Sequence, residues 1–197
     1  MFWIFLIALG YVLGSIPFGL VIAKQLKGID PRTAGSRNIG ATNVARLCGT
    51  KIGIIALFFD LLKGVVPTLT AVTHGGGAFV VSLVALATVL GHIYPIFLGF
   101  KGGKAVATTI GVFLAISPLV TILAALSCAG VIAWSGYVSM GSLTLAVALP
   151  FFCLITGKWA FLPLALVLMA ILFVRHRENI RRIGRGEENA WRKKKDA

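Results

Sequence analysis

The sequence predicts an all-α, polytopic integral membrane protein. Three observations support this fold class. Of the 197 residues, 58% are hydrophobic and 13% are charged, whereas about 25% of the residues in a soluble domain are charged. The apolar residues form runs of the length that crosses a bilayer. The basic residues gather at the ends of some of these runs, as they do beside a membrane. Lipid is therefore the solvent for most of this chain.

Charged and turn residues divide the chain into seven apolar segments. A full span needs about 20 apolar residues, so the fourth, fifth and seventh segments are short for a bilayer of ordinary thickness. We predict seven spans, with five as the alternative. The first segment lacks a preceding basic residue and a cleavage pattern, so we expect a retained span rather than a signal peptide. The predicted segments are 2–23, 53–73, 78–98, 105–116, 119–134, 138–156 and 159–174.

The orientation follows from three basic regions, 24–51, 101–104 and 175–195. Because Lys and Arg mark the cytoplasmic side, we predict an external N-terminus and a cytoplasmic C-terminus. An even number of crossings must then separate neighbouring basic regions. We expect one transmembrane domain over 1–197, with 179–197 as a basic cytoplasmic tail.

The net charge and the cysteines exclude some functions. A charge of +13 suggests nucleic-acid binding in a soluble protein. Here the basic residues flank apolar runs, so we predict membrane lipids and no nucleic acid as partners. Cys48, Cys128 and Cys153 are widely spaced among apolar residues, which favours reduced, structural thiols.

The loop after the first segment carries the donors that a phosphate group needs. Residues 34–46 combine glycines with a hydroxyl, two amides and two guanidiniums. The alternative interpretation is a polar turn whose arginines set the topology. The candidate residues are Gly35, Ser36, Asn38, Gly40, Ala41, Thr42, Asn43 and Arg46.

A second glycine-rich loop, residues 99–104, leads into the fourth segment. We expect Gly102 and Gly103 to present free amides at a helix N-terminus, with Lys104 adding a full charge. The loop is not a nucleotide-binding P-loop, because Leu98 stands where that motif needs glycine. A tight turn with snorkelling lysines is the alternative.

A third polar region follows the last segment. In a helix, His176, Asn179 and Ile180 share one face, which presents an imidazole and an amide at the membrane surface. The alternative is a basic tail that binds anionic headgroups.

Two further groups lie within the apolar segments. Asp60 and Lys63 are three residues apart and can form an ion pair, whose role is either structural or functional. We favour a packing or supporting role for His92. The six carboxylates do not cluster at metal-ligand spacing, so we predict neither a metal nor a cofactor. No Gly-x-Ser-x-Gly elbow is present.

These regions together resemble the small bacterial acyl-phosphate-dependent glycerol-3-phosphate acyltransferase family, called PlsY. The resemblance covers almost the whole chain and departs at Ala105, where glycine is expected and where a methyl group could crowd the phosphate site. The matching residues are 35–43, Arg46, Gly91, His92, Tyr94, Pro95, 101–104, His176, Asn179, Ile180, Arg182, Gly186 and Glu188.

The resemblance implies an enzyme of the bacterial cytoplasmic (inner) membrane with seven helices and an active site facing the cytoplasm. It implies acyl transfer from acyl-phosphate to glycerol 3-phosphate, which gives lysophosphatidic acid and inorganic phosphate, the first step of phospholipid synthesis. The alternative function is a small membrane transporter for a phosphorylated solute, and a third is a structural subunit.

Residue roles follow from the resemblance together with residue type. We expect Ser36, Arg46, Lys104, His176 and Asn179 to be catalytic and to hold glycerol 3-phosphate. Backbone amides of 40–43 and 102–103 are expected to hold the acyl-phosphate head, and the acyl chain is expected in a groove between helices. The further substrate-binding candidates are Gly35, Asn38, Arg182 and Glu188. Either His176 or the substrate phosphate accepts the proton. All these regions are expected to converge on one metal-free site.

Overall fold

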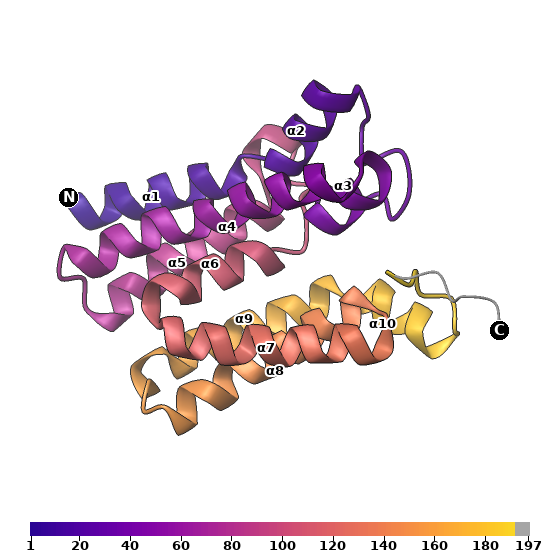
Figure 1. Ribbon diagram of the computed structural model, residues 1–197. Helices are drawn as coiled ribbons and strands as arrows, with labels where there is room; N and C mark the ends of the chain where they lie inside the picture. Colours follow the sequence, from indigo (N-terminus) through magenta and orange to yellow (C-terminus); the bar gives the residue numbers. More distant parts are fainter. Residues whose placement is uncertain (192–197) are drawn as a thin grey trace. The chain divides into compact units, whose positions relative to one another are not determined.

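The computed structural model describes residues 1–191, and within that range the regular structure is entirely helical (Figure 1). Two compact units divide the chain, Met1–Pro118 and a second that begins at Leu119. Residues 192–197, the end of the predicted basic tail, lie outside the described part. The helices of the first unit are α1 (Phe2–Ser15), α2 (Phe18–Lys27), α3 (Ala41–Cys48), α4 (Thr50–Thr73), α5 (Ala78–Ile93), the 3-10 helix η1 (Ile96–Leu98) and α6 (Val106–Ile116). Those that follow are α7 (Pro118–Ser135), α8 (Val138–Ile155), the 3-10 helix η2 (Trp159–Phe161), α9 (Leu162–Arg175) and α10 (Arg177–Gly184).

The helices agree with the predicted membrane class. Within residues 1–191, five helical segments are long and apolar enough to cross a bilayer, and a pair bent by 57°, Trp159–Arg175 with Arg177–Gly184, adds a sixth if the pair forms one span. The fourth predicted segment, 105–116, contains α6, a shorter apolar helix. All seven predicted segments thus contain a helix, while seven crossings remain a prediction. The five segments are Phe2–Lys27, Thr50–Thr73, Ala78–Leu98, Pro118–Ser135 and Val138–Ile155.

The first predicted segment is not one continuous helix. It breaks between α1 and α2, where Ile16 adopts an extended conformation with ψ of 116°. Pro17 explains the break, because proline lacks the N–H that a helix needs and disfavours helical geometry in the residue before it. α2 then ends at Gly28, which has a positive φ of 66°.

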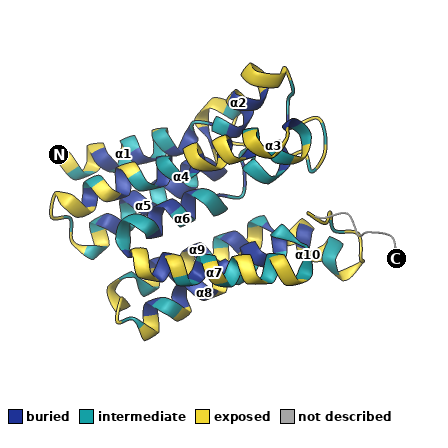
Figure 2. Cartoon of the chain, viewed as in Figure 1, coloured by how far each residue is buried: buried dark blue, intermediate teal, exposed yellow. Residues whose placement is uncertain are grey.

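Close helix contacts hold the first unit together. α1 packs on α5 and α4 packs on α6, and buried residues follow these contact faces (Figure 2). A Cβ atom at Gly14 would overlap the Thr88 carbonyl, and one at Gly111 would overlap the Leu61 carbonyl. Small residues are therefore needed where these backbones meet, as is common for helices packed in lipid.

The chain direction brings two polar loops of the first unit to the same end. α4 runs away from the loop that precedes it, α5 returns, and α6 starts again from that end (Figure 1). Residues 28–40 and 99–105 therefore lie at the end of the unit opposite the N-terminus.

The second unit pairs α8 with α9 and places α10 at the end where α7 turns into α8. The Trp191 N–H donates a 2.8 Å hydrogen bond to the Gly136 carbonyl in that turn. The segment after α10 is therefore fixed against the turn.

Candidate functional site

A buried amide organises the loop that leads into α3. The Asn43 side chain, 1% exposed, donates from Nδ2 to the carbonyls of Pro31 at 2.8 Å, Asn38 at 2.9 Å and Ala34 at 3.2 Å. Its Oδ1 accepts from the Ser36 N–H at 2.9 Å. These bonds use the donors and the acceptor of the amide. The Asn43 side chain therefore shapes the loop. The sequence had instead predicted that Asn43 binds the substrate.

Other groups of this loop face outward. Arg46 is exposed on α3, with no ion pair among residues 1–191. Ala41 and Thr42 occupy the first turn of α3, whose N–H groups have no acceptor within the helix. By contrast, Asn38 Oδ1 accepts from the Gly40 N–H at 2.9 Å. Arg37 is likewise exposed and has no ion pair within residues 1–191. The loop thus keeps two guanidiniums and a pair of backbone donors for a ligand.

Gly35 has a structural reason to be glycine. Its φ is 60°, and a Cβ atom there would overlap Asn43 Oδ1. Nearby, Arg32 and Asp30 form a 2.6 Å ion pair, and the hydrogen bonds from Arg32 hold the pKa of Asp30 well below its usual range. Arg32 is thus neutralised by a neighbour and Arg46 is not, which separates two arginines that look alike in the sequence.

The loop between η1 and α6 uses its glycine amides internally. The Gly102 N–H donates to the Ile93 carbonyl at 3.1 Å and the Gly103 N–H to the His92 carbonyl at 3.2 Å. Pro95 ends α5, so these carbonyls need donors from elsewhere in the chain. The expectation that both amides hold a phosphate group is therefore not met in this arrangement. Lys104 follows directly and is half-buried.

Ala105 adopts a conformation that favours glycine. It caps the N-terminus of α6 with φ of 61° and is 1% exposed. A non-glycine residue in the left-handed region is strained by about 1–2 kcal/mol. This backbone geometry gives a physical reason for expecting glycine at this position.

In the second unit, His176 lies at the bend between α9 and α10 and is 2% exposed. Its Nδ1 lies 2.8 Å from the Leu172 carbonyl. Because a carbonyl only accepts, Nδ1 carries the proton, and Nε2 is the acceptor in the neutral ring. The shared face predicted for this region holds for His176 and Asn179, which are both buried, while Ile180 is 42% exposed.

A carboxylate holds the polar side of α10. Glu188 accepts from Asn179 Nδ2 at 2.6 Å and from Arg182 Nε at 2.8 Å. Burial raises the pKa of Glu188, but the hydrogen bonds from Arg182 and Asn179 outweigh it, so the pKa is lowered overall. Glu188 therefore stays ionised and fixes the Asn179 amide.

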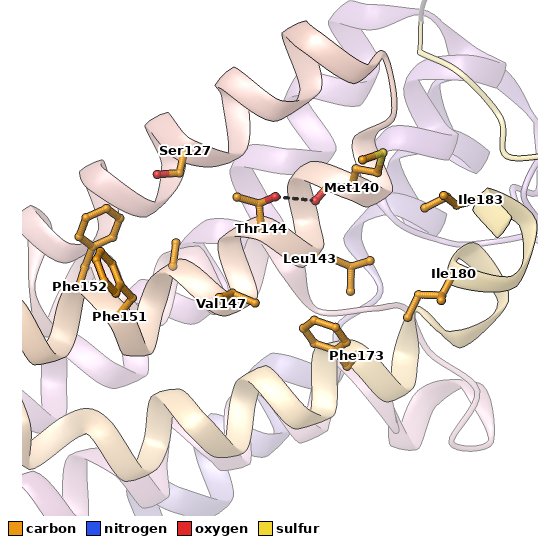
Figure 3. A pocket seen from close by; sticks show the side chains of 11 residues that line it. Ser127, Met140, Leu143, Thr144, Val147, Phe151, Phe152, Phe173, Ile180 and Ile183 are labelled. Atoms are coloured by element: carbon orange, nitrogen blue, oxygen red, sulfur yellow. Dashed lines mark hydrogen bonds between the residues drawn. The ribbon is translucent and has the colours of Figure 1, made fainter.

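An apolar pocket of about 660 Å³ lies within the second unit, between α7, α8, α9 and α10 (Figure 3). The hydroxyls in its wall are occupied, since Ser127 donates to the Leu123 carbonyl and Thr144 to the Met140 carbonyl. The pocket thus suits a hydrocarbon, and its volume lies within the range of about 300–1,000 Å³ that is usual for ligand sites. Its lining residues are Ser127, Met140, Leu143, Thr144, Val147, Ala148, Phe151, Phe152, Phe173, Ile180 and Ile183.

Sequence reasoning missed most of these pocket residues and the buried hydroxyls of Thr108 and Ser139. The apolar pattern shows that α8 is buried in lipid or protein but not which of its residues surround a cavity.

Among residues 1–191, no group of three His, Cys, Asp or Glu side chains is placed to hold a metal ion. The three cysteines are free thiols.

Comparisons with known proteins agree over almost the whole chain. The family model described as glycerol-3-phosphate acyltransferase matches residues 4–186. A protein of that name from Maridesulfovibrio salexigens is 56% identical over 195 residues, covering 99% of this chain and 100% of its own length.

Two crystal structures of PlsY, an integral membrane glycerol 3-phosphate acyltransferase, share the fold. The glycerol 3-phosphate form has a TM-score of 0.93 at 46% identity, and covers 96% of both chains. The lysophosphatidic acid form has a TM-score of 0.91 at 45% identity, and covers 96% of this chain and 95% of its own. By sequence and by fold, this chain belongs to the glycerol-3-phosphate acyltransferase family.

Proposed function

We propose that this chain transfers an acyl group from acyl-phosphate to glycerol 3-phosphate. A hydroxyl oxygen of glycerol 3-phosphate forms an ester bond with the acyl carbon, and the bond from that carbon to the phosphate oxygen breaks. Lysophosphatidic acid and inorganic phosphate are the products. Family membership over residues 4–186 is the observation that carries this proposal, and the polar loops supply the chemistry.

Both substrates are anions, so the reaction needs positive groups whose charge is not already neutralised. Arg46 meets this condition, because it is exposed and has no ion pair among residues 1–191. We assign the phosphate of glycerol 3-phosphate to Arg46, Ser36 and Lys104 of the first unit. In the second unit, His176 and Asn179 keep the catalytic role that the resemblance implies. A guanidinium binds phosphate oxygens in a bidentate manner, which fixes the orientation as well as the affinity.

The acyl-phosphate head is assigned to the first turn of α3. The backbone N–H groups of Ala41 and Thr42 point out of the helix end, where the dipole favours an anion. We assign Gly102 and Gly103 a different role, which is to hold Lys104 in place through their bonds to α5. The side chains of Asn43 and Glu188 likewise position substrate-binding groups.

His176 and the substrate phosphate are both suited to accept the hydroxyl proton. Since the Leu172 carbonyl keeps the proton on Nδ1, the Nε2 lone pair of the neutral ring is the basic atom. Acyl-phosphate is an activated anhydride, so positioning and charge stabilisation supply much of the acceleration. A His176→Ala variant that keeps most of its kcat with a raised KM would assign the proton to the substrate phosphate.

The acyl chain is assigned to the apolar pocket of the second unit. Ile180 and Ile183 of α10 line one part of it, and Ile180 adjoins Asn179 in the chain. Along α8 the lining runs from Met140 to Phe152, which corresponds to about 18 Å of helix. A long-chain acyl group fits a pocket of this length, with its reactive end beside the polar residues of α10.

The proposed setting is the bacterial cytoplasmic membrane, crossed seven times, with the N-terminus outside and the active site facing the cytoplasm. The two polar loops of the first unit lie at one end of that unit and carry basic residues, which supports a cytoplasmic position. A cysteine added at the C-terminus should react with an impermeant thiol reagent only after spheroplasts are opened, while one placed before Phe2 should react in intact spheroplasts.

The decisive experiment measures inorganic phosphate released by the purified protein in detergent. We expect release from palmitoyl-phosphate only when glycerol 3-phosphate is present, and no acyl transfer from palmitoyl-CoA or palmitoyl-acyl carrier protein. A transporter would bind the phosphorylated solute without turnover in detergent. Absence of turnover with every donor would reject the proposed enzyme.

Arg46→Ala tests the assigned anion site, with Arg32→Ala as the matched control. We expect loss of Arg46 to lower kcat/KM for glycerol 3-phosphate at least about 100-fold, because a charged hydrogen-bonding partner of the substrate is removed. Arg32, which is paired with Asp30, should have a small effect. Wild-type kinetics for Arg46→Ala would remove Arg46 from the site.

A further inference from the structure

A cluster of four polar side chains is buried inside the first unit, within apolar helices. It consists of Asp60 and Lys63 of α4, His92 of α5 and Thr108 of α6, all at most 5% exposed. Lys63 Nζ lies 2.7 Å from Asp60 Oδ1, and His92 Nδ1 lies 3.8 Å from the same oxygen. Charged groups are costly within a membrane segment, so a cluster of this kind calls for a specific role.

One branch of the cluster reaches the break between α1 and α2. Lys63 Nζ donates a 2.8 Å hydrogen bond to the carbonyl of Ile16, the residue before the helix-breaking Pro17. The same ammonium lies 5.8 Å from the centre of the Phe18 ring, at the start of α2. Lys63 thus fixes the start of α2, the helix that leads into the loop carrying Ser36 and then to α3, which carries Arg46.

The other branch runs through a shared hydroxyl. Thr108 Oγ1 donates to the Asp60 backbone carbonyl at 3.1 Å and lies 3.1 Å from His92 Nδ1. Because the hydroxyl proton goes to the carbonyl, His92 Nδ1 is the donor to Thr108 Oγ1. The imidazole is therefore held in one tautomer and one orientation between α4 and α6.

The second glycine-rich loop, residues 99–104, packs against the His92 imidazole. A Cβ atom at Gly103 would overlap His92 Nε2, and one at Gly102 would overlap the His92 carbonyl. The Gly103 N–H also donates to that carbonyl at 3.2 Å. Lys104, the next residue along the chain, is thereby placed by the position of His92.

We propose that the buried cluster of Asp60, Lys63, His92 and Thr108 positions both anion-binding loops of the first unit. Lys63 holds the start of α2, the helix that leads toward Ser36 and Arg46. His92 holds the loop that carries Lys104. These are positioning residues, since each acts through backbone that it holds. The inference rests on the proposed function, because its readout is the binding of glycerol 3-phosphate.

Adjacent threonines on α6 provide the test and its matched control. Thr108 and Thr109 are both 0% exposed, but the Thr109 hydroxyl has no hydrogen-bond partner among residues 1–191. We expect Thr108→Val to raise the KM for glycerol 3-phosphate about tenfold or more, since small displacements of a binding group weaken catalysis strongly. Thr108→Ser keeps the hydroxyl and should have the wild-type KM. The KM of Thr109→Val should stay within about twofold of the wild-type value.

A second pair of variants probes the contact between His92 and Gly103 directly. Gly103→Ala adds a methyl group against the imidazole, so we expect it to raise the same KM. Combining it with His92→Asn removes the overlapping ring atom, and the double variant should have a lower KM than Gly103→Ala alone. This reversal is a coupling between neighbours that a general loss of stability does not produce.

The outcomes separate this inference from the proposed function. A wild-type protein that releases no phosphate from any acyl donor defeats the function itself. If the wild type is active, equal KM values for Thr108→Val and Thr109→Val overturn the positioning role. So does a Thr108→Val variant with a lowered Tm and an unchanged KM, which would leave the cluster with a stabilising role alone. If Thr108→Val does not fold, the variants Gly103→Ala and His92→Asn provide the test. Additive effects of these two substitutions on the KM then overturn the inference.

Discussion

The loop before α3 and the segment after α10 are held in place by different chemistry. In the first unit, the neutral amide of Asn43 makes four hydrogen bonds to loop backbone. In the second unit, Glu188 holds Asn179 and Arg182 through its charge. A neutral organiser does not titrate near neutral pH, whereas a carboxylate can lose its charge in acid. The contribution of Asn43 to stability should therefore not depend on ionisation, whereas that of Glu188 should.

The largest effect is expected from removing the neutral organiser with Asn43→Ala. Four hydrogen bonds are lost and buried backbone groups are left without partners, which should destabilise the protein by about 3 kcal/mol. For a chain of this size, Tm should fall by about 10 °C. Thermal unfolding in detergent measures this, with the exposed Asn189→Ala as control. A Tm within about 2 °C of wild type would mean that the loop does not depend on Asn43.

A smaller effect is expected from Glu188→Gln, which keeps the side-chain shape and removes the charge. The hydrogen bond from Asn179 can persist, but the ion pair with Arg182 is lost. We expect kcat/KM to fall about tenfold and Tm to fall by about 3 °C. Glu187→Gln, at the exposed neighbouring position, is the control. Equal kinetics for the two variants would show that the charge at Glu188 is not needed.

The pH dependence sharpens the comparison further. The pKa of Glu188 is lower in the folded protein than its ordinary value of 4.5. The unfolded state therefore takes up a proton first as pH falls, so the stabilisation is complete above that value and is lost as pH falls through the folded pKa. We expect the Tm gap between wild type and Glu188→Gln to close as the pH falls below 4.5.

The pH measurement belongs in an Asp30→Asn background, because the pKa of Asp30 is lowered by Arg32 and that carboxyl also contributes in acid. The gap produced by Asn43→Ala should stay nearly constant over the same range. A gap for Glu188→Gln that is equally constant would contradict the difference between the two organisers.

The smallest effect is expected from Ala105→Gly. Glycine relieves the strain of a positive φ, about 1 kcal/mol, but loses a buried methyl group worth about 0.8 kcal/mol. We therefore expect nearly unchanged Tm and kinetics. A large rise in kcat/KM would instead mean that the Ala105 methyl crowds the neighbouring anion site.

The sequence predicted the apolar segments well because length and hydropathy are local properties. Each of the seven segments contains a helix, and the ion pair expected between Asp60 and Lys63 is present. The break at Pro17 was missed because the apolar run continues through it. The three polar regions were also recognised, since glycines, amides and guanidiniums are visible without any fold.

The sequence by itself determined that this chain lies in a membrane and carries donor-rich loops, since composition and spacing are sufficient for both. Tertiary structure decided which donors remain for a ligand. In the folded protein, the Asn43 side chain and the amides of Gly102 and Gly103 are hydrogen-bonded to backbone carbonyls. Arg46, by contrast, has no ion pair among residues 1–191. The physical reason is that most buried polar groups are hydrogen-bonded, and which polar groups become buried beside one another depends on how the loops fold.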